Sequence, residues 1–259
     1  MPRIERATVT TIDRDGVEEA LTRLRAVAER SGVELTDGDD ADIAIVLGGD
    51  GTMLRALGRF RGKSIPAVGV NYGRVGFLTA IPADNLEDGL QRVFAGDYRT
   101  IELSTLEVTV NGETRTAAND VVVAGGTLGR MVELGYAIGG EDLGSQPCDG
   151  LICATPAGST AYNLSNGGPV LVWGLDAMVL TFVAPHAIHI RPLVVPRGPD
   201  VVITNLTVGL ETSVLVDGQE VGALAHGDRA VVRVGAQPSL LATLPDATFF
   251  SRYAATFGS

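Results

Sequence analysis

The sequence predicts an α/β N-terminal domain of the Rossmann-like type, followed by a mostly antiparallel, β-rich C-terminal domain. Up to about residue 97, strand-like runs alternate with amphipathic helical segments, which is typical of a small doubly wound α/β fold. From residue 98 the pattern changes to short β-rich runs separated by turn dipeptides. We therefore expect an α/β domain at 1–97, a β-rich domain at 98–235, and a C-terminal tail at 236–259 that returns to the first domain.

The expected elements of the first domain begin with a strand at Ala7–Ile12, where apolar and polar residues alternate. A helix follows at Gly16–Ser31, with its apolar residues on one face, and Gly32 ends it. Ile43–Leu47 is a continuous apolar run, as expected for a parallel strand buried on both faces. The remaining helix, strand and amphipathic helix are expected at Thr52–Phe60, Ile65–Val70 and Asn85–Ala95.

Turn dipeptides organise the second domain. Leu106–Val110 and Glu113–Ala117 flank Asn111-Gly112, which is a strong signal for a β-hairpin. Further hairpin turns are expected at Gly139-Gly140, Asp217-Gly218 and Gly227-Asp228, and further strands at Val201–Ile203, Ser213–Val216 and Val231–Val234.

Composition excludes several classes of function. The 259 residues carry a net charge of −11 without a basic stripe, which argues against nucleic-acid and anionic-membrane partners. No apolar run reaches the roughly 18–20 residues of a membrane span. The only cysteines, Cys148 and Cys153, form no CxxC motif, and the three histidines have no companion ligands, so we expect no protein metal site. We expect a protein of a reducing compartment, the cytoplasm.

The sharpest motif is the glycine loop Gly48–Thr52 (GGDGT), placed between an expected buried strand and a helix. Ligands of open α/β sheets bind at such strand ends, and a helix N-terminus presents N–H groups to anions. Glycines let the backbone come close to a phosphate, whereas Asp50 repels one, a cost that a chemical role would explain. The alternative is a glycine-rich turn in which Asp50 only caps the helix.

Several motifs that occur in order make the chain resemble the NAD kinase family across about residues 43–220. They are GGDGT, GVNYGRVGFL at Gly69–Leu78, Asn119-Asp120, DGLICATPAGSTAYNLS at Asp149–Ser165, Gly167–Pro169, Pro185-His186 and Asp217-Gly218-Gln219. GGDGT alone is shared with diacylglycerol- and sphingosine-type lipid kinases, and in altered form with phosphofructokinases. The ATPAGSTAYNLS segment is much more specific.

The resemblance implies phosphoryl transfer from ATP, or polyphosphate, to the 2′-hydroxyl of the adenosine ribose of NAD, giving NADP. Asp50 would be the general base, with Gly51 and Arg55 near the phosphates. Asn119 and Asp120 would hold adenine and ribose, although the pair alone also fits an Asx turn entering a strand. Asp149 would face the dinucleotide pocket, and Ala184 and Gln219 would make further nucleotide contacts. The pocket would be lined by Thr160, Ala161, Tyr162, Asn163, Leu164 and Ser165.

The resemblance also implies Mg²⁺ or another divalent cation carried on the phosphoryl donor, and a homodimer or homotetramer with the site near an interface. One departure stands out: Pro147 and Cys148 replace the family's usual basic residue and glycine. The missing contact would come from elsewhere, with Arg130 as one candidate. Two rival functions remain, a GGDGT lipid kinase and a dinucleotide sensor without catalysis. A lipid kinase would leave the Ser159–Tyr162 (STAY) segment unexplained. An intact Asp50 argues against a sensor.

Overall fold

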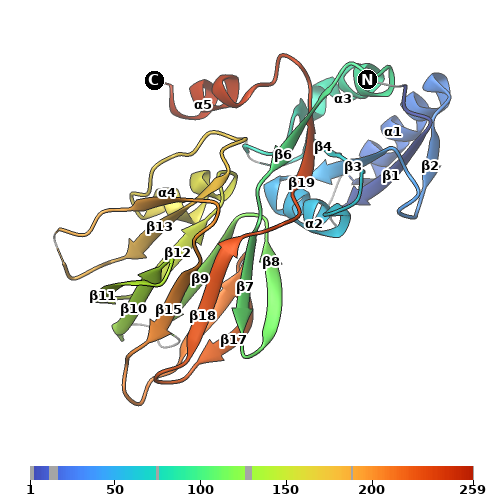
Figure 1. The fold of residues 1–259 in the computed structure, drawn as a ribbon. Coiled ribbons are helices and arrows are strands. Elements are labelled where there is room, and N and C mark those ends of the chain that lie inside the picture. Colours follow the sequence, from blue (N-terminus) through green and yellow to red (C-terminus); the bar gives the residue numbers. More distant parts are fainter. Residues whose placement is uncertain (1–2, 12–16, 74–75, 126–129, 188, 259) are drawn as a thin grey trace. The chain divides into compact units, whose positions relative to one another are not determined.

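The computed structural model describes residues 3–11, 17–73, 76–125, 130–187 and 189–258 (Figure 1). Two compact units comprise Met1–Leu103 with Pro238–Ser259, and Ser104–Gln237. The first unit extends beyond the break expected at residue 97 because β6 (Arg99–Leu103) pairs with β19 (Ser239–Thr243) in its sheet. Ile12, the expected end of the first strand, and Gly16, the expected start of the first helix, lie outside the described residues, as do Arg74 and Val75 of the Gly69–Leu78 motif.

The first unit has a seven-stranded sheet in the order β2-β1-β3-β4-β19-β6, with β5 beside β4. Its other strands are β1 (Arg6–Thr11), β2 (Glu34–Thr36), β3 (Ile43–Gly48), β4 (Ala67–Asn71) and β5 (Ile81–Pro82). All pairs are parallel except β19 with β6, so the sheet is mixed at one edge. Every residue of β3 is buried, as its continuous apolar run predicts.

Helices cover both faces of this sheet (Figure 1). They are α1 (Val17–Ser31), α2 (Asp50–Phe60) and α3 (Leu86–Phe94, after a 3₁₀ turn at Ala83–Asn85). The last helix of the unit is α5 (Phe249–Phe257). Val68 and Val70 of β4 share one core with α1 and α3. On the opposite face Gly69 lies under α2, because a Cβ there would be 2.8 Å from the Met53 sulfur. The two faces follow from the period-two alternation of a strand.

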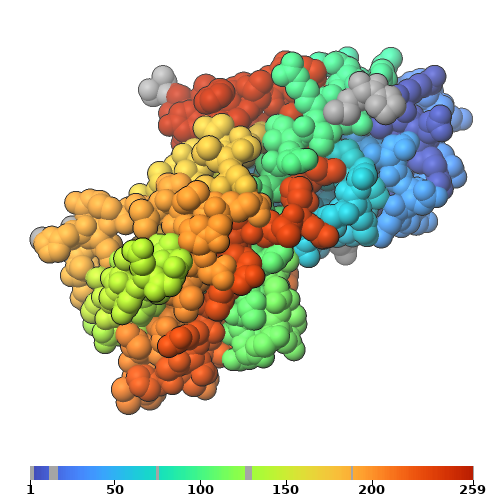
Figure 2. Space-filling model, in the orientation of Figure 1, coloured from blue at the N-terminus to red at the C-terminus, as the bar shows by residue number. Residues whose placement is uncertain are grey.

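The C-terminal residues belong to the first unit, in which β19 also lies parallel to β4. In the space-filling view, the red C-terminal residues lie beside blue-to-green residues of this unit (Figure 2). Helix α5 begins after Thr248, whose side chain accepts a hydrogen bond from the Ser251 N–H at 3.1 Å.

The second unit contains two six-stranded antiparallel sheets, ordered β11-β10-β15-β18-β7-β8 and β14-β13-β12-β9-β16-β17. Aliphatic side chains from both sheets form its main core. The strands are β7 (Leu106–Val110), β8 (Glu113–Ala117), β9 (Asp120–Gly125), β10 (Val132–Ile138), β11 (Glu141–Cys148), β12 (Gly150–Ala154), β13 (Ala177–Val183), β14 (Leu193–Pro196), β15 (Val201–Asn205), β16 (Thr212–Val216), β17 (Gln219–Leu224) and β18 (Arg229–Val234).

Three of the four expected hairpin turns are present. Asn111-Gly112, Gly139-Gly140 and Asp217-Gly218 join paired strands, and all six residues have positive φ. The hairpin expected at Gly227-Asp228 is wrong, because β17 pairs with β16 while β18 pairs with β15 and β7. This turn carries the chain from one sheet to the other. In the part of the chain that the structure describes, no helix is both long and apolar enough to cross a membrane.

Candidate active site

The glycine loop lies where β3 ends at Gly48 and α2 begins at Asp50. Gly48 is required by packing, because a Cβ there would lie 2.4 Å from the Thr52 hydroxyl oxygen. Cβ atoms at Gly49 and Gly51 would meet nothing within 4 Å. Two glycines at the start of a helix therefore border open space, as binding of an anion by backbone N–H groups requires.

The Asp50 carboxylate is held by a loop that follows β4. Its Oδ2 accepts a hydrogen bond from the Phe77 N–H at 2.8 Å, and its Oδ1 accepts one from the Leu78 N–H at 3.0 Å. Gly76 makes this approach possible, because a Cβ there would lie 2.2 Å from Oδ1. Asp50 is the first residue of α2 and Gly49 is the N-cap, so the alternative in which Asp50 caps the helix does not describe this side chain. A carboxylate with one amide on each oxygen is fixed in direction and retains lone pairs for a proton.

Arg55 lies one turn into α2, on its exposed side. Within the described ranges it makes no ion pair, in contrast to Arg59 of the same helix, which pairs with Asp39 at 3.1 Å. An unpaired guanidinium one turn from a glycine loop remains able to bind a phosphate.

In the second unit, the turn residue Asp217 holds the Asn119-Asp120 segment. Its carboxylate accepts hydrogen bonds from the N–H groups of Ala118 at 2.8 Å, Asn119 at 2.7 Å and Asp120 at 3.1 Å. Asp217 adopts φ +47°, which Asp tolerates better than most residues. The sequence predicts a hairpin turn here and includes Asp217 in a motif of the resemblance, but a single sequence has no signal that links Asp217 to residues about a hundred positions earlier.

The side chains of Asn119 and Asp120 each carry a buried oxygen that can accept a hydrogen bond. The Asn119 side-chain oxygen is buried and has no hydrogen-bond partner among the described residues, so it is an acceptor left for a ligand donor. Asp120 is 7% exposed, and burial, with a smaller effect of the Asp217 charge, raises its pKa to about 6. Gln219 is exposed at the start of β17, directly after the turn that contains Asp217.

The segment after β12 packs on Asn119. The Thr155 N–H donates to the Asn119 carbonyl at 2.8 Å, and a Cβ at Gly158 would lie 2.1 Å from the same oxygen. The predicted pocket residues follow in a 3₁₀ turn (Gly158–Thr160) and α4 (Tyr162–Ser165). Of the six predicted residues, Tyr162 and Ser165 are exposed, Thr160, Ala161 and Leu164 are half-buried, and Asn163 is fully buried.

The Asn163 side chain does not line a pocket, in contrast to the prediction. Its amide donates to the carbonyl oxygens of Ser159 at 2.9 Å and Pro169 at 3.1 Å, and its oxygen accepts from the Thr181 hydroxyl at 2.6 Å. Gly168 lies so close that a Cβ would overlap this amide. Asn163 therefore shapes the segment from within, and a ligand is left to its neighbours.

Asp149 and Ala184 form a separate group at the other end of the same sheet. Gly150 pairs with Val183 of β13 and with Ala124 of β9, whereas Asp120 pairs with Ala154. Four residue steps along β12 correspond to roughly 13 Å. Within one chain, β12 therefore carries Asp149 to the end of the sheet opposite Asn119.

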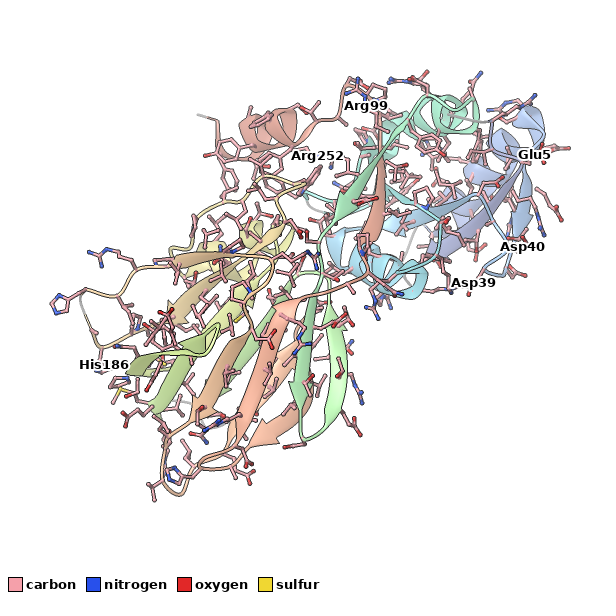
Figure 3. All side chains as sticks on the ribbon, in the orientation of Figure 1. Glu5, Asp39, Asp40, Arg99, His186 and Arg252 are labelled. Atoms are coloured by element: carbon pink, nitrogen blue, oxygen red, sulfur yellow. The ribbon has the colours of Figure 1, made fainter. Side chains whose placement is uncertain are left out.

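The exposed residues near Asp149 include the departure from the family pattern. Pro147 is exposed and its carbonyl accepts from the N–H of His186, which lies in the loop after β13 (Figure 3). Cys148 is in the core, where burial raises its pKa to about 12. Arg130 is exposed, and its carbonyl lies beside Gly125, whose N–H donates to the Asp149 carbonyl. The backbone of Arg130 therefore lies close to that of Asp149, with Gly125 between them.

A metal ion held by the protein needs several ligating side chains close together. No group of three or more His, Cys, Asp or Glu side chains in those ranges is arranged to hold a metal ion.

A held carboxylate in a GGDGT loop, within an α/β unit that precedes an antiparallel β unit, defines a kinase of the GGDGT class. Family models narrow this class: residues 5–98 match the ATP-NAD kinase N-terminal domain, and residues 118–244 match the ATP-NAD kinase C-terminal domain. The chain belongs to the NAD kinase family, a family of phosphotransferases.

Individual relatives agree with this assignment. The chain is 41% identical to the NAD kinase of Gemmatimonas aurantiaca over 227 residues, which cover 85% of this chain and 78% of that protein. It is 39% identical to the NAD kinase of Heliobacterium modesticaldum over 236 residues, covering 89% and 83%. Among solved structures, an Archaeoglobus fulgidus NAD kinase in complex with ATP has a TM-score of 0.79 and 25% identity, covering 95% and 98%. Yeast NADH kinase complexed with NADH has the same fold, with a TM-score of 0.87 at 19% identity, covering 100% and 88%.

Proposed function

We propose that this chain transfers the terminal phosphoryl group of ATP to the 2′-hydroxyl of the adenosine ribose of NAD, giving NADP, with Asp50 as general base. One observation carries the proposal: the Asp50 carboxylate is fixed by the amides of Phe77 and Leu78 beside a glycine loop whose Gly49 and Gly51 border open space. The family membership supplies the acceptor and the donor.

In this mechanism Asp50 orients the 2′-hydroxyl and accepts its proton. A hydroxyl is a weak nucleophile at neutral pH, and a positioned base contributes typically 10²–10⁴-fold. Phosphoryl transfer passes through a loose transition state, so alignment and neutralisation of charge outweigh the basicity of the carboxylate. The N–H groups of Phe77 and Leu78 provide this alignment, because they fix the direction of the Asp50 carboxylate. Gly51 at the start of α2 and Arg55 one turn later would bind the transferred phosphoryl group.

Recognition of NAD is assigned to the second unit. The side-chain oxygen of Asn119 would accept from the adenine amino group, and Asp120 would accept from ribose hydroxyls. Thr160, Ala161, Tyr162, Leu164, Ser165 and Gln219 would line the dinucleotide pocket, with Asn163 shaping it. The donor would be ATP with its bound Mg²⁺, which neutralises the charge of the triphosphate; polyphosphate is the second donor to test.

The position of Asp149 and Ala184 supports a homo-oligomer, a dimer or a tetramer. These residues lie roughly 13 Å along β12 from the Asn119 end of the sheet. In a homo-oligomer, the Asp149–Ala184 group of one copy, together with Arg130, would complete the nucleotide site of another. The proposed location of the protein is the cytoplasm, where both cysteines stay reduced, as they are in the structure.

The test is incubation of the purified full chain with NAD, ATP and Mg²⁺, with NADP read by an NADP-specific dehydrogenase. We expect NADP formation, abolished by omission of ATP, and parallel reactions with polyphosphate and NADH define donor and acceptor scope. Binding of NAD without NADP formation from either donor would contradict the proposal and support a sensor. Phosphorylation of diacylglycerol or sphingosine in place of NAD would support the lipid kinase.

A further inference from the structure

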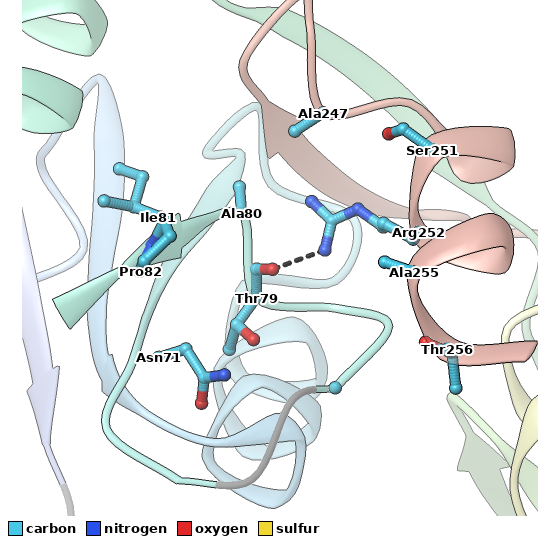
Figure 4. Close-up of a pocket in the computed structure, with 11 residues that line it drawn as sticks. Asn71, Thr79, Ala80, Ile81, Pro82, Ala247, Ser251, Arg252, Ala255 and Thr256 are labelled. Atoms are coloured by element: carbon cyan, nitrogen blue, oxygen red, sulfur yellow. Dashed lines mark hydrogen bonds between the residues drawn. The ribbon is translucent and has the colours of Figure 1, made fainter. Parts of the chain in front are cut away.

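Arg252 is a buried arginine of α5 and points from that helix toward the loop that holds Asp50 (Figures 3 and 4). Its side chain is 8% exposed within the first unit. Nη1 donates to the carbonyl oxygens of Phe77, at 2.8 Å, and Thr79, and Nη2 donates to the Thr243 hydroxyl at 3.1 Å. Burying a guanidinium is unfavourable unless it is hydrogen-bonded, and both Nη atoms of Arg252 have acceptors.

The two sides of one short loop are bound by opposite charges. The N–H groups of Phe77 and Leu78 donate to Asp50, while the carbonyls of Phe77 and Thr79 accept from Arg252. The Phe77 carbonyl and the Leu78 N–H belong to the same peptide group. A single planar peptide therefore joins the Arg252 cation to the Asp50 carboxylate.

This connection has a physical consequence for Asp50. A cation on a carbonyl oxygen polarises the peptide and strengthens the hydrogen bond that its N–H donates. Burial lowers the pKa of Arg252 to about 10, although the nearby Asp50 charge acts in the opposite direction and raises it. The guanidinium is therefore charged at neutral pH and exerts its effect continuously.

We propose that Arg252 is a positioning residue for the catalytic carboxylate, acting through the Phe77–Leu78 peptide to fix the direction of Asp50. The proposal rests on the proposed function for the role of Asp50. If it holds, a buried cation on α5, far away in the sequence, is needed to fix the loop of residues 76–79 that holds Asp50.

The fold allows Arg252 to be replaced without detaching α5. The Phe77 ring contacts the rings of Phe249 and Phe257 of α5, with centroids 5.9 Å and 5.7 Å apart. These aromatic contacts do not depend on the guanidinium. A cavity of about 270 Å³ borders Arg252 and is lined by Asn71, Gly76, Ser251 and Ala255 among others (Figure 4). A small cation can therefore reach the position left by a shortened side chain.

The experiment compares Arg252→Met, Arg252→Lys and Arg252→Ala in the full chain, with the exposed Arg99→Met as matched control. We expect kcat of Arg252→Met to fall about 10- to 100-fold, with KM for NAD and for ATP within about threefold, because orientation of the base is lost while binding remains. Arg252→Lys restores part of kcat because it keeps the charge. Millimolar guanidinium, but not equal KCl, restores part of kcat in Arg252→Ala. Arg99→Met behaves as wild type.

A second readout does not use activity. In NMR spectra of the folded protein, the Leu78 amide proton moves upfield in Arg252→Met because the peptide is less polarised, whereas Arg99→Met leaves it unchanged. Wild-type kcat in Arg252→Met, an unmoved Leu78 proton, or parallel loss of kcat, both KM values and thermal stability without guanidinium rescue would overturn the proposal. A moved Leu78 proton together with an active Asp50→Asn would instead show that the proposed role of Asp50 is the part that fails.

Discussion

Replacement of Gly76 by alanine adds one methyl group to the loop that holds Asp50, and so tests the geometry of that loop. A Cβ at residue 76 would lie 2.2 Å from Asp50 Oδ1 and 2.4 Å from its carboxyl carbon. Ordinary non-bonded contact begins near 3.4 Å, so the carboxylate or the loop must move by about 1.2 Å. A misplacement of about 1 Å reduces rate by roughly 10²-fold, so we expect kcat to fall about 100-fold while KM for NAD changes little.

The assay is steady-state NADP formation, with urea unfolding as a check on the fold. Displacement of Asp50 weakens two charge-assisted hydrogen bonds, so we expect the first unit to lose about 1–3 kcal/mol of stability and still fold. Gly58→Ala is the matched control, because a Cβ at this position of α2 meets nothing within 4 Å. That variant should keep its kcat and gain about 0.5–1 kcal/mol in the helix. A kcat of Gly76→Ala within twofold of wild type would refute the assigned geometry.

Three further substitutions test the second unit. Asp217→Asn keeps the left-handed backbone but loses part of the carboxylate that accepts three N–H groups. We expect the free energy of unfolding to fall by about 1–3 kcal/mol and KM for NAD to rise. An unchanged KM in nucleotide titrations would contradict this. Folding raises the pKa of Asp120 to about 6. Its protonated carboxyl therefore contributes to the free energy of unfolding below pH 4, and this contribution is lost as pH rises through 6. Asp120→Asn should therefore raise the unfolding free energy by up to about 3 kcal/mol at pH 8 and less at pH 5, and equal gains at both pH values would be inconsistent with it. Thr181→Val leaves the buried Asn163 oxygen without its 2.6 Å donor and should cost about 1–3 kcal/mol in denaturant unfolding, whereas a neutral effect would deny Asn163 its structural role.

Sequence patterns predicted much of the fold because local forces determine it. The apolar run at Ile43–Leu47 corresponds to β3, in which every residue is buried, and Gly32, the expected helix stop, has φ +68°. Paired turn residues identified three hairpins for the same reason, since their backbone requires positive φ. The failure at Gly227-Asp228 has a non-local cause. A Gly-Asp turn looks the same whether it joins neighbouring strands or carries the chain between sheets.

The candidate site was predicted in the same uneven way. The motifs led to Asp50 and Asn119-Asp120, but the groups that hold them are distant in sequence: Phe77 and Leu78 for the first, and Asp217 for the second. These hydrogen bonds depend on tertiary packing, so they leave no periodic pattern in the sequence. Asn163 shows the opposite error, because membership of a motif says nothing about whether a side chain faces a ligand or the interior.

The central claim is that Asp50 is the general base, and Asp50→Asn measures it most directly. Asparagine has nearly the same shape and can still accept one of the two loop amides, but it cannot take a proton from the 2′-hydroxyl. Single-turnover NADP formation and NAD binding should be measured on the same preparation. We expect the rate to fall by at least two orders of magnitude, with NAD affinity within a few-fold of wild type. A rate near that of wild type, with NAD bound normally, would contradict it.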